Sequence, residues 1–505
     1  MHRAPFFAPA LHPRPRRLIP PLSDRLADGR PVLTHEQAQT IMRQVMALTT
    51  VALSGVELTH RYRAVTRLAR NRVRTTDDGE SLRLGFHAAF DRGLVGAYIE
   101  TNQIDDETIR ALVLRVDALA KEMIGSREEL RPMQHDQQDL FLPAKLWYDS
   151  SVDAMRSGRE EAVPHIVSTI QGHGLQAAGA LGLMARSRAV LTHDGITGFF
   201  EETDCEVSVT ARPEDGSCSG WGGQAHRDWS KIDPGHIAAN AADMAVRSRH
   251  PQAIEPGRRV AILSPEAVVQ LMRYLVMHFE GSDSDNGFTG FSKAPGRPKG
   301  SRFLQRVFDP RITITLDPAD PDGGFRAWHG GTEGAYANPR LTLIENGVLK
   351  NLTYTNTIIA LGLGRPYSDL PHGLHLHGGD TTLEQMIAQC DEGIYVNRFS
   401  SIDLVDRQSG MITGVTRDGC FLVKHGKIDR PVKNFRFLTS PFFFLNNVIA
   451  IGPARRTAFG FTPFSYSEQA ISTGDGTMFE WPRFPMIVPP LMVRDFNFNA
   501  LIDAV

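Results

Sequence analysis

The sequence has few cysteines, no excess of charge of either sign and no long apolar run. Only four of its 505 residues are cysteine, and the formal net charge is −2. The four cysteines, Cys205, Cys218, Cys390 and Cys420, form no C-x-x-C pair, which argues against a zinc ribbon. So few cysteines are typical of a reducing compartment and predict buried or surface thiols. The small net charge argues against nucleic acid as the main partner, because phosphate binding needs a concentrated basic face.

A membrane span and a signal peptide also lack support in the sequence. No window of about 18 consecutive apolar residues occurs, which is the length that a spanning helix needs. Residues 1–33 lack the apolar core of a secretory signal and are rich in Pro and Arg, which is typical of a flexible arm. We therefore expect a cytoplasmic protein with no membrane contact.

Helical patterns are concentrated in the first half of the chain. Thr34 is expected to be the N-cap of a helix, with Gln37 as its capping-box partner. Residues 105–124 show the spacing of an amphipathic helix. A further helix is predicted to begin with Asp233 as N-cap and Pro234 as its first residue.

Turn signals divide the remaining sequence into short apolar runs. Residues 77–79 and 91–93, which read Asp-Asp-Gly and Asp-Arg-Gly, predict turns between strands. The segments "IENGVL" and "VKHGKI" predict β-hairpins. One helix is predicted within "DTTLEQMIAQCDEG", with Gly393 as its C-terminal stop.

The character of the chain changes between about residues 250 and 285, after which helical periodicity almost vanishes. We therefore predict an α+β fold, a class in which helices and antiparallel sheet are segregated. Its N-terminal α/β domain, residues 34–260, would combine an antiparallel sheet with helices. Its C-terminal domain, residues 261–505, would be mostly antiparallel β, curled into a barrel or a sandwich. The length is in keeping with two to four domains.

One apolar stretch lies at the junction of the two predicted domains. Residues 264–281, "SPEAVVQLMRYLVMHFEG", begin with Ser-Pro-Glu and then become almost wholly apolar. The pattern predicts a buried helix. The stretch contains a single histidine, His278, near its end.

Four stretches of the chain, taken in order, resemble the TldD/PmbA (TldD/TldE) family, the so-called modulators of DNA gyrase that are linked to metal-dependent peptide cleavage. Residues 86–123 are similar to the strand–strand–helix element near the family's N-terminus. Residues 308–363, which open with "FDPRITITLD" and contain "IENGVLK", resemble its central block. Residues 381–437 resemble the next block, and residues 489–501, "PPLMVRDFNFNAL", resemble its closing strand. No single piece is diagnostic, because each consists mostly of turn residues. The resemblance rests on the four pieces taken in order.

The resemblance implies a pair of related subunits, only one of which binds a metal ion. In that subunit a His-Glu-x-x-x-His helix and a later Cys hold the metal, which is expected to be zinc. Such a site uses imidazole ligands, a carboxylate base and an open position for water, and it cleaves peptides by polarising the carbonyl group. The other subunit lacks these residues.

The apolar stretch occupies the place of the family's metal helix. Counted back from "FEG", the six motif positions fall on residues 272–277, so that Met272 and Met277 replace the histidines and Arg273 replaces the glutamate. A thioether is a poor zinc ligand, and a guanidinium cannot act as a base. A register slip of one residue would bring His278 to one ligand position, but one histidine alone does not make a site.

The family's cysteine ligand is also missing from its expected region. Residues 451–484 contain no cysteine, and Cys420 lies well before them in a different element. The resemblance therefore implies a PmbA/TldE-type subunit with no catalytic residue, metal or cofactor of its own. Zinc is expected in a TldD-like partner subunit, in a heterodimer that cleaves extended peptide or peptide-derived substrates; maturation of a natural product or removal of a leader peptide would be a plausible context. A scaffolding homodimer is an alternative.

Two groups of residues are candidates for substrate binding. Trp328, His329 and Glu333 lie at the family's acidic-Gly turn, where they could line a peptide groove or belong to an exposed turn with one packed aromatic. His375 and His377 are two residues apart, so on a strand their side chains share a face.

The histidine pair also supports a second hypothesis. Together with Asp380, His375 and His377 could hold a metal that belongs to this chain alone. The family scaffold would then serve a small-molecule or peptide-modifying enzyme. A polar loop that binds substrate, or nothing, is the simpler interpretation of the same residues.

Overall fold

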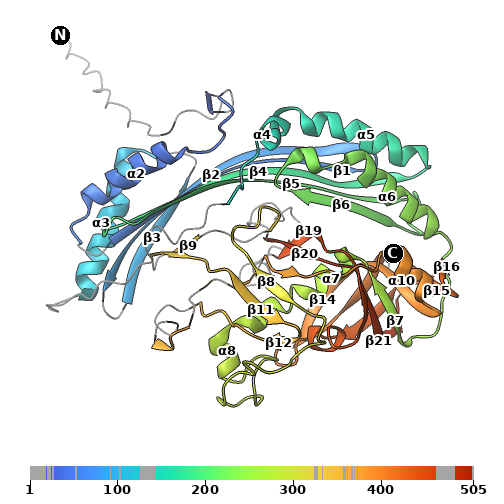
Figure 1. The fold of residues 1–505 in the computed structure, drawn as a ribbon. Helices are drawn as coiled ribbons and strands as arrows, with labels where there is room; N and C mark the ends of the chain where they lie inside the picture. The colour runs from blue at the N-terminus through green and yellow to red at the C-terminus, as the bar shows by residue number, and fades with distance from the viewer. Residues whose placement is uncertain are drawn as a thin grey trace, which may run out of the picture.

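The computed structural model describes most of the chain in two closely packed parts. It covers residues 28–51, 54–90, 93–101, 104–124, 144–323, 328–331, 334–355, 373–461 and 484–502, with residues 19, 24, 25, 360, 362–365, 368, 370 and 371. Figure 1 shows a long, curved N-terminal sheet arching over a C-terminal part built mainly of strands.

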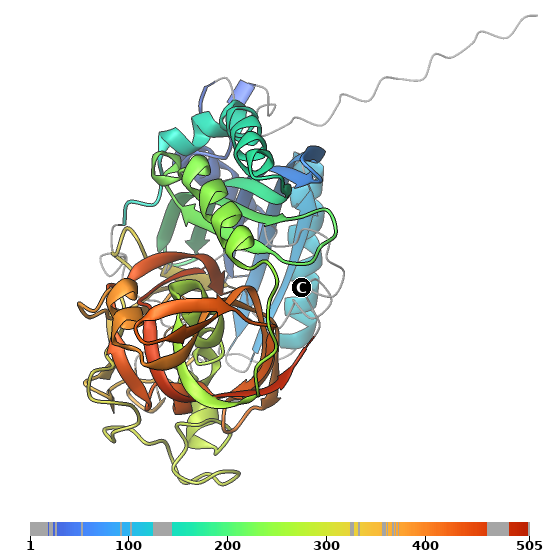
Figure 2. The ribbon, with the colours of Figure 1, turned by 90° about the vertical axis from the view of Figure 1, so that its right-hand side faces the viewer.

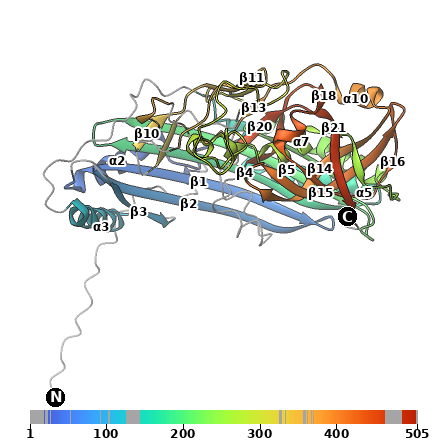
Figure 3. The same ribbon diagram turned by 90° about the horizontal axis from the view of Figure 1, so that it is seen from below.

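The N-terminal sheet has six antiparallel strands in the order β3-β2-β1-β4-β5-β6. Its strands are β1 Ser54–Ala69, β2 Arg72–Phe90, β3 Gly93–Thr101, β4 Gln176–Thr192, β5 Thr197–Arg212 and β6 Gly220–His226. Seen from below in Figure 3, β1 and β2 run along much of the length of the molecule. The sheet therefore provides one long, continuous face above the C-terminal part.

The turn between β1 and β2 lies at a site that the sequence did not indicate. Arg70 and Asn71 connect the strands, and both have positive φ, 52° and 59°. Asn71 tolerates this conformation because its side chain bonds to the neighbouring strand, accepting from the amide of Ala177. The turn predicted at residues 77–79 is wrong, since these residues lie within β2 and pair with β1. Of residues 91–93, the first two lie outside the described residues.

Helices cover one face of this sheet near both of its ends. They are α2 His35–Leu48, α3 Asp106–Ile124, α4 Asp149–Arg156, α5 Gly158–Gly172, the short 3-10 helix η2 Trp229–Lys231 and α6 Pro234–Arg247. The capping box of Thr34 and Gln37 is confirmed, as is the Asp233 N-cap followed by Pro234. In Figure 1, α2 and α3 lie at one end of the sheet and α4, α5 and α6 at the other, so this part has two separate apolar cores.

The C-terminal part contains a closed barrel, seen in Figure 2 with β7 in yellow-green and the other strands in orange to red. Five strands follow the order β14-β7-β21-β17-β15, and β15 pairs with β14 to close the circle. They are β7 Gly257–Leu263, β14 Glu392–Asp406, β15 Met411–Lys424, β17 Phe435–Thr439 and β21 Leu491–Leu501; β16 Lys427–Pro431 and β18 Val448–Ile451 attach outside the ring. The β7–β14 pair is parallel, and the other pairs in the ring are antiparallel.

A second sheet, with the order β12-β11-β8-β13-β20-β19, lies beside the barrel. Its strands are β8 Ile314–Leu316, β11 Leu341–Glu345, β12 Val348–Leu349, β13 His375–Leu376, β19 Arg455–Phe461 and β20 Phe484–Val488, and a separate hairpin joins β9 Trp328–Gly331 to β10 Gly334–Ala337. Both predicted hairpins are confirmed: they turn at Asn346-Gly347 and at His425-Gly426, all four residues with positive φ. The predicted α+β fold with a barrel in its second part is therefore confirmed.

The helices of the C-terminal part are short. They are α7 Pro265–Met272, the 3-10 helix η3 Val276–Phe279, α8 Gly281–Asp285, α10 Leu383–Gln389 and α11 Pro441–Phe444. The predicted stop at Gly393 is wrong, because α10 already ends at Gln389 and Gly393 lies in β14. Glycine is required there for space: a Cβ would come 2.6 Å from the sulfur of Cys390.

Candidate functional site

The apolar stretch 264–281 is not one helix. Ser264 caps α7 by accepting from the amide of Ala267, and α7 ends at Met272. The amides of Tyr274, Leu275 and His278 then bond to carbonyls only three residues back, the pattern of a tightened 3-10 turn. The predicted single helix is therefore broken in the middle of the six positions matched to the metal motif.

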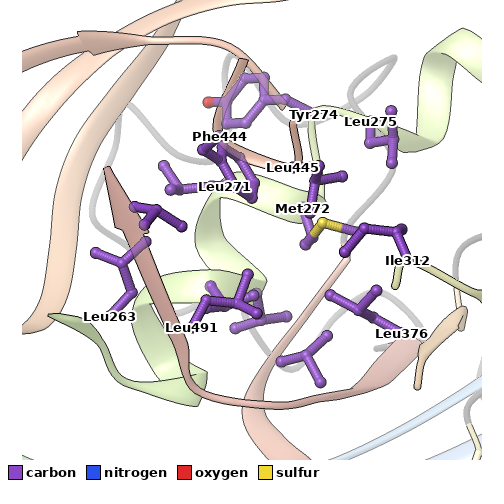
Figure 4. Close-up of a cluster of buried hydrophobic side chains, with 14 of the residues drawn as sticks. Leu263, Leu271, Met272, Tyr274, Leu275, Ile312, Leu376, Phe444, Leu445 and Leu491 are labelled. Atoms are coloured by element: carbon purple, nitrogen blue, oxygen red, sulfur yellow. The ribbon is translucent and has the colours of Figure 1, made fainter. Parts of the chain in front are cut away.

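Three residues, Met272, Arg273 and Met277, stand where the resemblance places the motif's ligands and base, and the first two pack within the protein. Met272 is fully buried and lies among Leu271, Ile312 and Leu445 in Figure 4. The guanidinium of Arg273 lies 5.1 Å from the ring centroid of Tyr274, whose hydroxyl donates to the carbonyl of Ile402. A buried thioether and a stacked guanidinium do not fit a zinc site.

Met277 is half-buried on η3. It too offers only a thioether, so none of the three positions supplies a nitrogen, oxygen or thiolate ligand suited to zinc. The donor set of this segment does not fit the metal that the family's motif binds.

His278 is held as a neutral core residue. Its side chain is 0% exposed, and the amide of Gly290 donates to its Nδ1 at 3.1 Å. The ring packs edge-on against Phe442 with centroids 4.9 Å apart. Its Nε2 has no hydrogen-bond partner among the described residues. Burial, reinforced by the charge of Arg407, lowers the pKa of His278 to about 3, so the imidazole carries no charge at pH 7.

This depressed pKa predicts a loss of stability in acid. An unfolded chain protonates the histidine below about pH 6.5, whereas the folded chain does not until about pH 3. The contribution to stability is therefore full above pH 6.5 and declines as the pH falls, by on the order of 4 kcal/mol at its limit. We expect His278→Gln to flatten the pH dependence of the urea midpoint between pH 7.5 and 4.5.

The exposed residue His425 provides the control for this measurement. Its ring nitrogen Nδ1 lies 2.9 Å from Asp391, and both side chains are open to solvent. His425→Gln should leave the wild-type slope in place. An unchanged slope in His278→Gln would show that the buried imidazole is not the acid-sensitive group.

The predicted pair of histidines is confirmed to share one face. The rings of His375 and His377 stack with centroids 4.5 Å apart and 9° between their planes. His377 Nε2 lies 2.9 Å from the hydroxyl of Thr315 on the neighbouring strand β8. Burial lowers the pKa of both histidines, and for His375 the positive potential of His377 adds to this while Asp320 opposes it. Both rings are therefore biased toward the neutral form.

A third ligand is not gathered around this pair. Within the described ranges, no three His, Cys, Asp or Glu side chains are arranged to hold a metal ion. Asp380 is exposed on the segment that follows β13. His372 lies outside the described residues. The metal site at His375, His377 and Asp380 stays a prediction. The structure brings together the two imidazoles that this site would need.

Trp328 lies under the N-terminal sheet. It is 1% exposed, and its ring meets Phe200 of β5 edge-on at 5.4 Å between centroids. The guanidinium of Arg188 on β4 lies 5.3 Å from its ring centroid. His329 follows in β9, and Glu333 lies outside the described residues. The structure thus shows Trp328 packed between the two parts, while a role of these residues in substrate binding stays a prediction.

Sequence reasoning missed a buried ionic network at the same junction. Glu202 of β5 forms ion pairs with Arg186 of β4 and with Arg227, and all three side chains are buried. Arg227 also donates to the carbonyl of Gly323 in the C-terminal part, at 3.2 Å. The signal available in the sequence was a set of charges within otherwise apolar strands.

A second link in the same place involves the loop after β8. Arg456 of β19 donates to the carbonyl of Asp322 at 2.6 Å and forms an ion pair with Asp204 of β5. His226 Nε2 lies 3.3 Å from the carboxylate of Asp322. The loop around residue 322 is therefore fastened to the N-terminal sheet by charged groups from both parts.

A pocket of about 210 Å³ lies elsewhere on the junction. It is lined by Ser217, Cys218, Ser219, Ser248, Pro251, Asp418, Gly419, Cys420, Val432, Lys433, Asn434 and Ile502. One carboxylate oxygen of Asp418 accepts a hydrogen bond from Arg398 Nε at 2.5 Å. Its other oxygen, Oδ1, and the hydroxyl of Ser248 have no hydrogen-bond partner within the described part of the chain. Ordered water commonly satisfies buried polar atoms of this kind. The predicted candidate residues do not line this pocket.

These features define a class of protein: an α+β chain in which a curved antiparallel sheet is joined, through a charged interface, to a closed five-stranded barrel. All four cysteines are buried and unpaired. None of the helices in the described part of the chain has the length and apolar character that crossing a membrane requires.

The family follows from comparison with known proteins. Residues 256–500 match the PmbA/TldA metallopeptidase C-terminal domain. A stretch of 170 residues is 27% identical to the metalloprotease TldD homolog of Buchnera aphidicola, and it covers 30% of this chain and 35% of that protein. The match thus spans about a third of the relative's length. The C-terminal part of the chain, residues 256–500, thus belongs to the TldD/PmbA family, which is metallopeptidase-related.

Solved structures with the same fold cover nearly the whole chain. A protein of Thermotoga maritima described as a candidate modulator of DNA gyrase has a TM-score of 0.72 and 13% identity, over 91% of this chain and 99% of its own. A similarly described protein of Bacteroides thetaiotaomicron has a TM-score of 0.70 and 15% identity, over 93% and 100%. TldE from Thermococcus kodakarensis has a TM-score of 0.70 and 16% identity, over 91% and 99%. At these identities the likeness concerns the fold.

Proposed function

We propose that this chain is the subunit without a metal site in a TldD/TldE-like heterodimeric metallopeptidase. The observation that carries the proposal is the burial of Met272 in the apolar core, at the place of a ligand in the family's motif. With Arg273 and Met277 beside it, this segment supports the barrel by packing and contributes no group that could polarise a peptide bond. The metal and the water-activating carboxylate then come from a TldD-like partner.

The contribution of this chain would be to complete the chamber and bind substrate in extended form. A peptide can pair with an exposed strand edge through main-chain hydrogen bonds, which recognise an unfolded segment with little regard to its sequence. The stacked pair of His375 and His377 would offer neutral imidazoles to the bound chain. The unpaired, buried cysteines suit a reducing compartment, so we place the complex in the cytoplasm.

Reconstitution with a partner tests this proposal. The purified chain should not cleave an unstructured peptide, whereas its complex with a TldD-like chain bearing His-Glu-x-x-x-His should do so and lose this activity in EDTA. The matched control is the same complex with the partner's motif glutamate replaced by glutamine, which should form but remain inactive. Robust, EDTA-sensitive cleavage by this chain alone would disprove the assignment.

The histidine pair supports a second candidate function, an enzyme with a metal of its own. Two parallel imidazoles biased toward the neutral form are in the protonation state that metal ligands require. Metal content after purification, compared with that of the variants His375→Ala and His377→Ala, separates the two candidates. One bound metal per chain that both variants lose would favour the second.

A further inference from the structure

A strongly basic loop lies between α8 and β8. Residues 288–306, here called the basic loop, contain five Lys or Arg residues and no Asp or Glu, in a chain whose net charge is −2. The five cations are Lys293, Arg297, Lys299, Arg302 and Arg306. In Figures 1 and 2 this part of the chain lies at the lower edge, on the side of the C-terminal part that faces away from the N-terminal sheet.

The positive charge of the basic loop is not compensated within the described structure. All of its cations are exposed except Arg302, which is half-buried, and none of them forms an ion pair there. Arg302 and Arg306 donate instead to backbone carbonyls, those of Arg306 and Asn346. The nearby acidic residue Asp283 is paired with Arg407, outside the loop.

Hydrogen bonds hold the basic loop in one shape. The amide of Lys293 donates to the carbonyl of Gly300 at 2.9 Å, and the amide of Arg302 donates to the carbonyl of Phe291 at 2.6 Å. Asp285, which precedes the loop, anchors it by accepting the amide of Ser301 at 2.9 Å. Binding through cations on an ordered loop loses less conformational entropy than binding through cations on a free chain.

Two large apolar side chains project from the same loop. Leu304 is 62% exposed and Phe288 is 52% exposed. Leu304 also has a φ of +60°, a left-handed conformation that is uncommon for a residue with a side chain of this kind. A residue in such a conformation is maintained by the surrounding structure, and residues of this kind cluster at active sites, ligand clamps and switch regions. The loop therefore presents fixed cations beside exposed apolar groups.

We propose that the basic loop is a docking surface for an acidic polypeptide segment that also carries apolar side chains. Uncompensated cations attract carboxylates, while Leu304 and Phe288 offer area for apolar contact. A single-stranded nucleic acid fits less well, because it needs aromatic platforms on which bases can stack. Arg365 lies 4.6 Å from the ring centroid of Phe303 and occupies one face of that ring, and Leu304 cannot stack.

Fluorescence anisotropy with the full chain tests the proposal. The probes are a labelled peptide of alternating Glu and Leu, the same peptide with Gln for Glu, and an oligonucleotide of equal charge. We expect the acidic peptide to bind with an affinity that falls as salt is added, and to bind about tenfold more weakly to Arg297→Gln/Lys299→Gln. Leu304→Gly, which suits the left-handed backbone, should weaken binding without unfolding the chain.

The matched control changes the same charge elsewhere. Arg72 and Arg74 are exposed on β2, and Arg72→Gln/Arg74→Gln should bind the acidic peptide as the wild type does. Equal loss in both double variants would reduce the effect to net charge and overturn the proposal. Tighter binding of the oligonucleotide than of the acidic peptide, or no binding of the acidic peptide to the wild type, would overturn it as well. None of these outcomes depends on peptidase activity.

Discussion

Replacing Glu202 by glutamine should lower the free energy of unfolding by about 3–5 kcal/mol. The carboxylate of Glu202 pairs with Arg186 through one oxygen and with Arg227 Nη1 through the other, at 2.8 Å. All three side chains are buried, so Glu202 compensates the charge of both guanidiniums away from solvent. The amide keeps the shape of the side chain but removes the negative charge that both buried guanidiniums contact. Urea unfolding of the single variant measures the effect.

Glu201 on the same strand provides the matched control. It pairs with Arg30 at 2.7 Å, but both side chains are substantially open to solvent. Glu201→Gln should therefore cost less than about 1 kcal/mol, as exposed ion pairs do. Equal losses in the two variants would show that the buried network is no more important than a surface pair.

The same network bears on how the two parts of the protein hold together. Arg227 donates to the carbonyl of Gly323, so a displaced guanidinium would remove one of the links between the loop near residue 322 and the sheet. Faster hydrogen exchange in that loop is expected in Glu202→Gln at a urea concentration where the chain is still folded.

The sequence predicted well those features of the fold that depend on residues close together in the chain. The capping box of Thr34 and the N-cap of Asp233 involve only neighbours in the sequence. The turns at Asn346-Gly347 and His425-Gly426 likewise need positive φ, which Asn and Gly supply and which His can adopt. The stacking of His375 and His377 follows from the two-residue period of a strand.

Predictions failed where a non-local contact overrides a local signal. Residues 77–79 contain a turn-like Asp-Asp-Gly, but cross-strand pairing keeps them in β2 and the chain turns at Arg70-Asn71 without a glycine. Gly393 reads as a helix stop, yet it serves to make room for Cys390 within the barrel. The break after Met272 was hidden because both halves of the stretch are buried and equally apolar.

The junction network could not be predicted for a related reason. Arg186 and Glu202 face one another only because β4 and β5 pair in that register, and Arg227 arrives from beyond β6. Charged residues on a strand usually indicate a solvent-exposed face. Here they face the C-terminal part, whose position the sequence alone does not predict.

Replacing Trp328 by alanine should destabilise the protein by about 3–5 kcal/mol, the usual cost of removing a buried aromatic side chain. The indole packs edge-on against Phe200 and lies close to Gly198, where an added Cβ would come 2.8 Å from the ring. It therefore fills a site on the N-terminal sheet with a side chain from β9. The loss should appear in the urea midpoint. Limited proteolysis should at the same time become faster in the hairpin of β9 and β10.

Two further variants separate packing from substrate contact at Trp328. Trp328→Phe keeps an aromatic ring and should cost less than the alanine variant, because a smaller cavity remains. Trp147→Ala removes a tryptophan that is only partly buried, with its Nε1 donating to Asp149, and its effect should also be smaller. If Trp328 acts by packing alone, the loss of stability in these variants should increase with the buried area that each substitution removes. If Trp328→Ala keeps the wild-type midpoint but weakens peptide binding by the paired complex, Trp328 contacts the substrate and the packing interpretation is wrong.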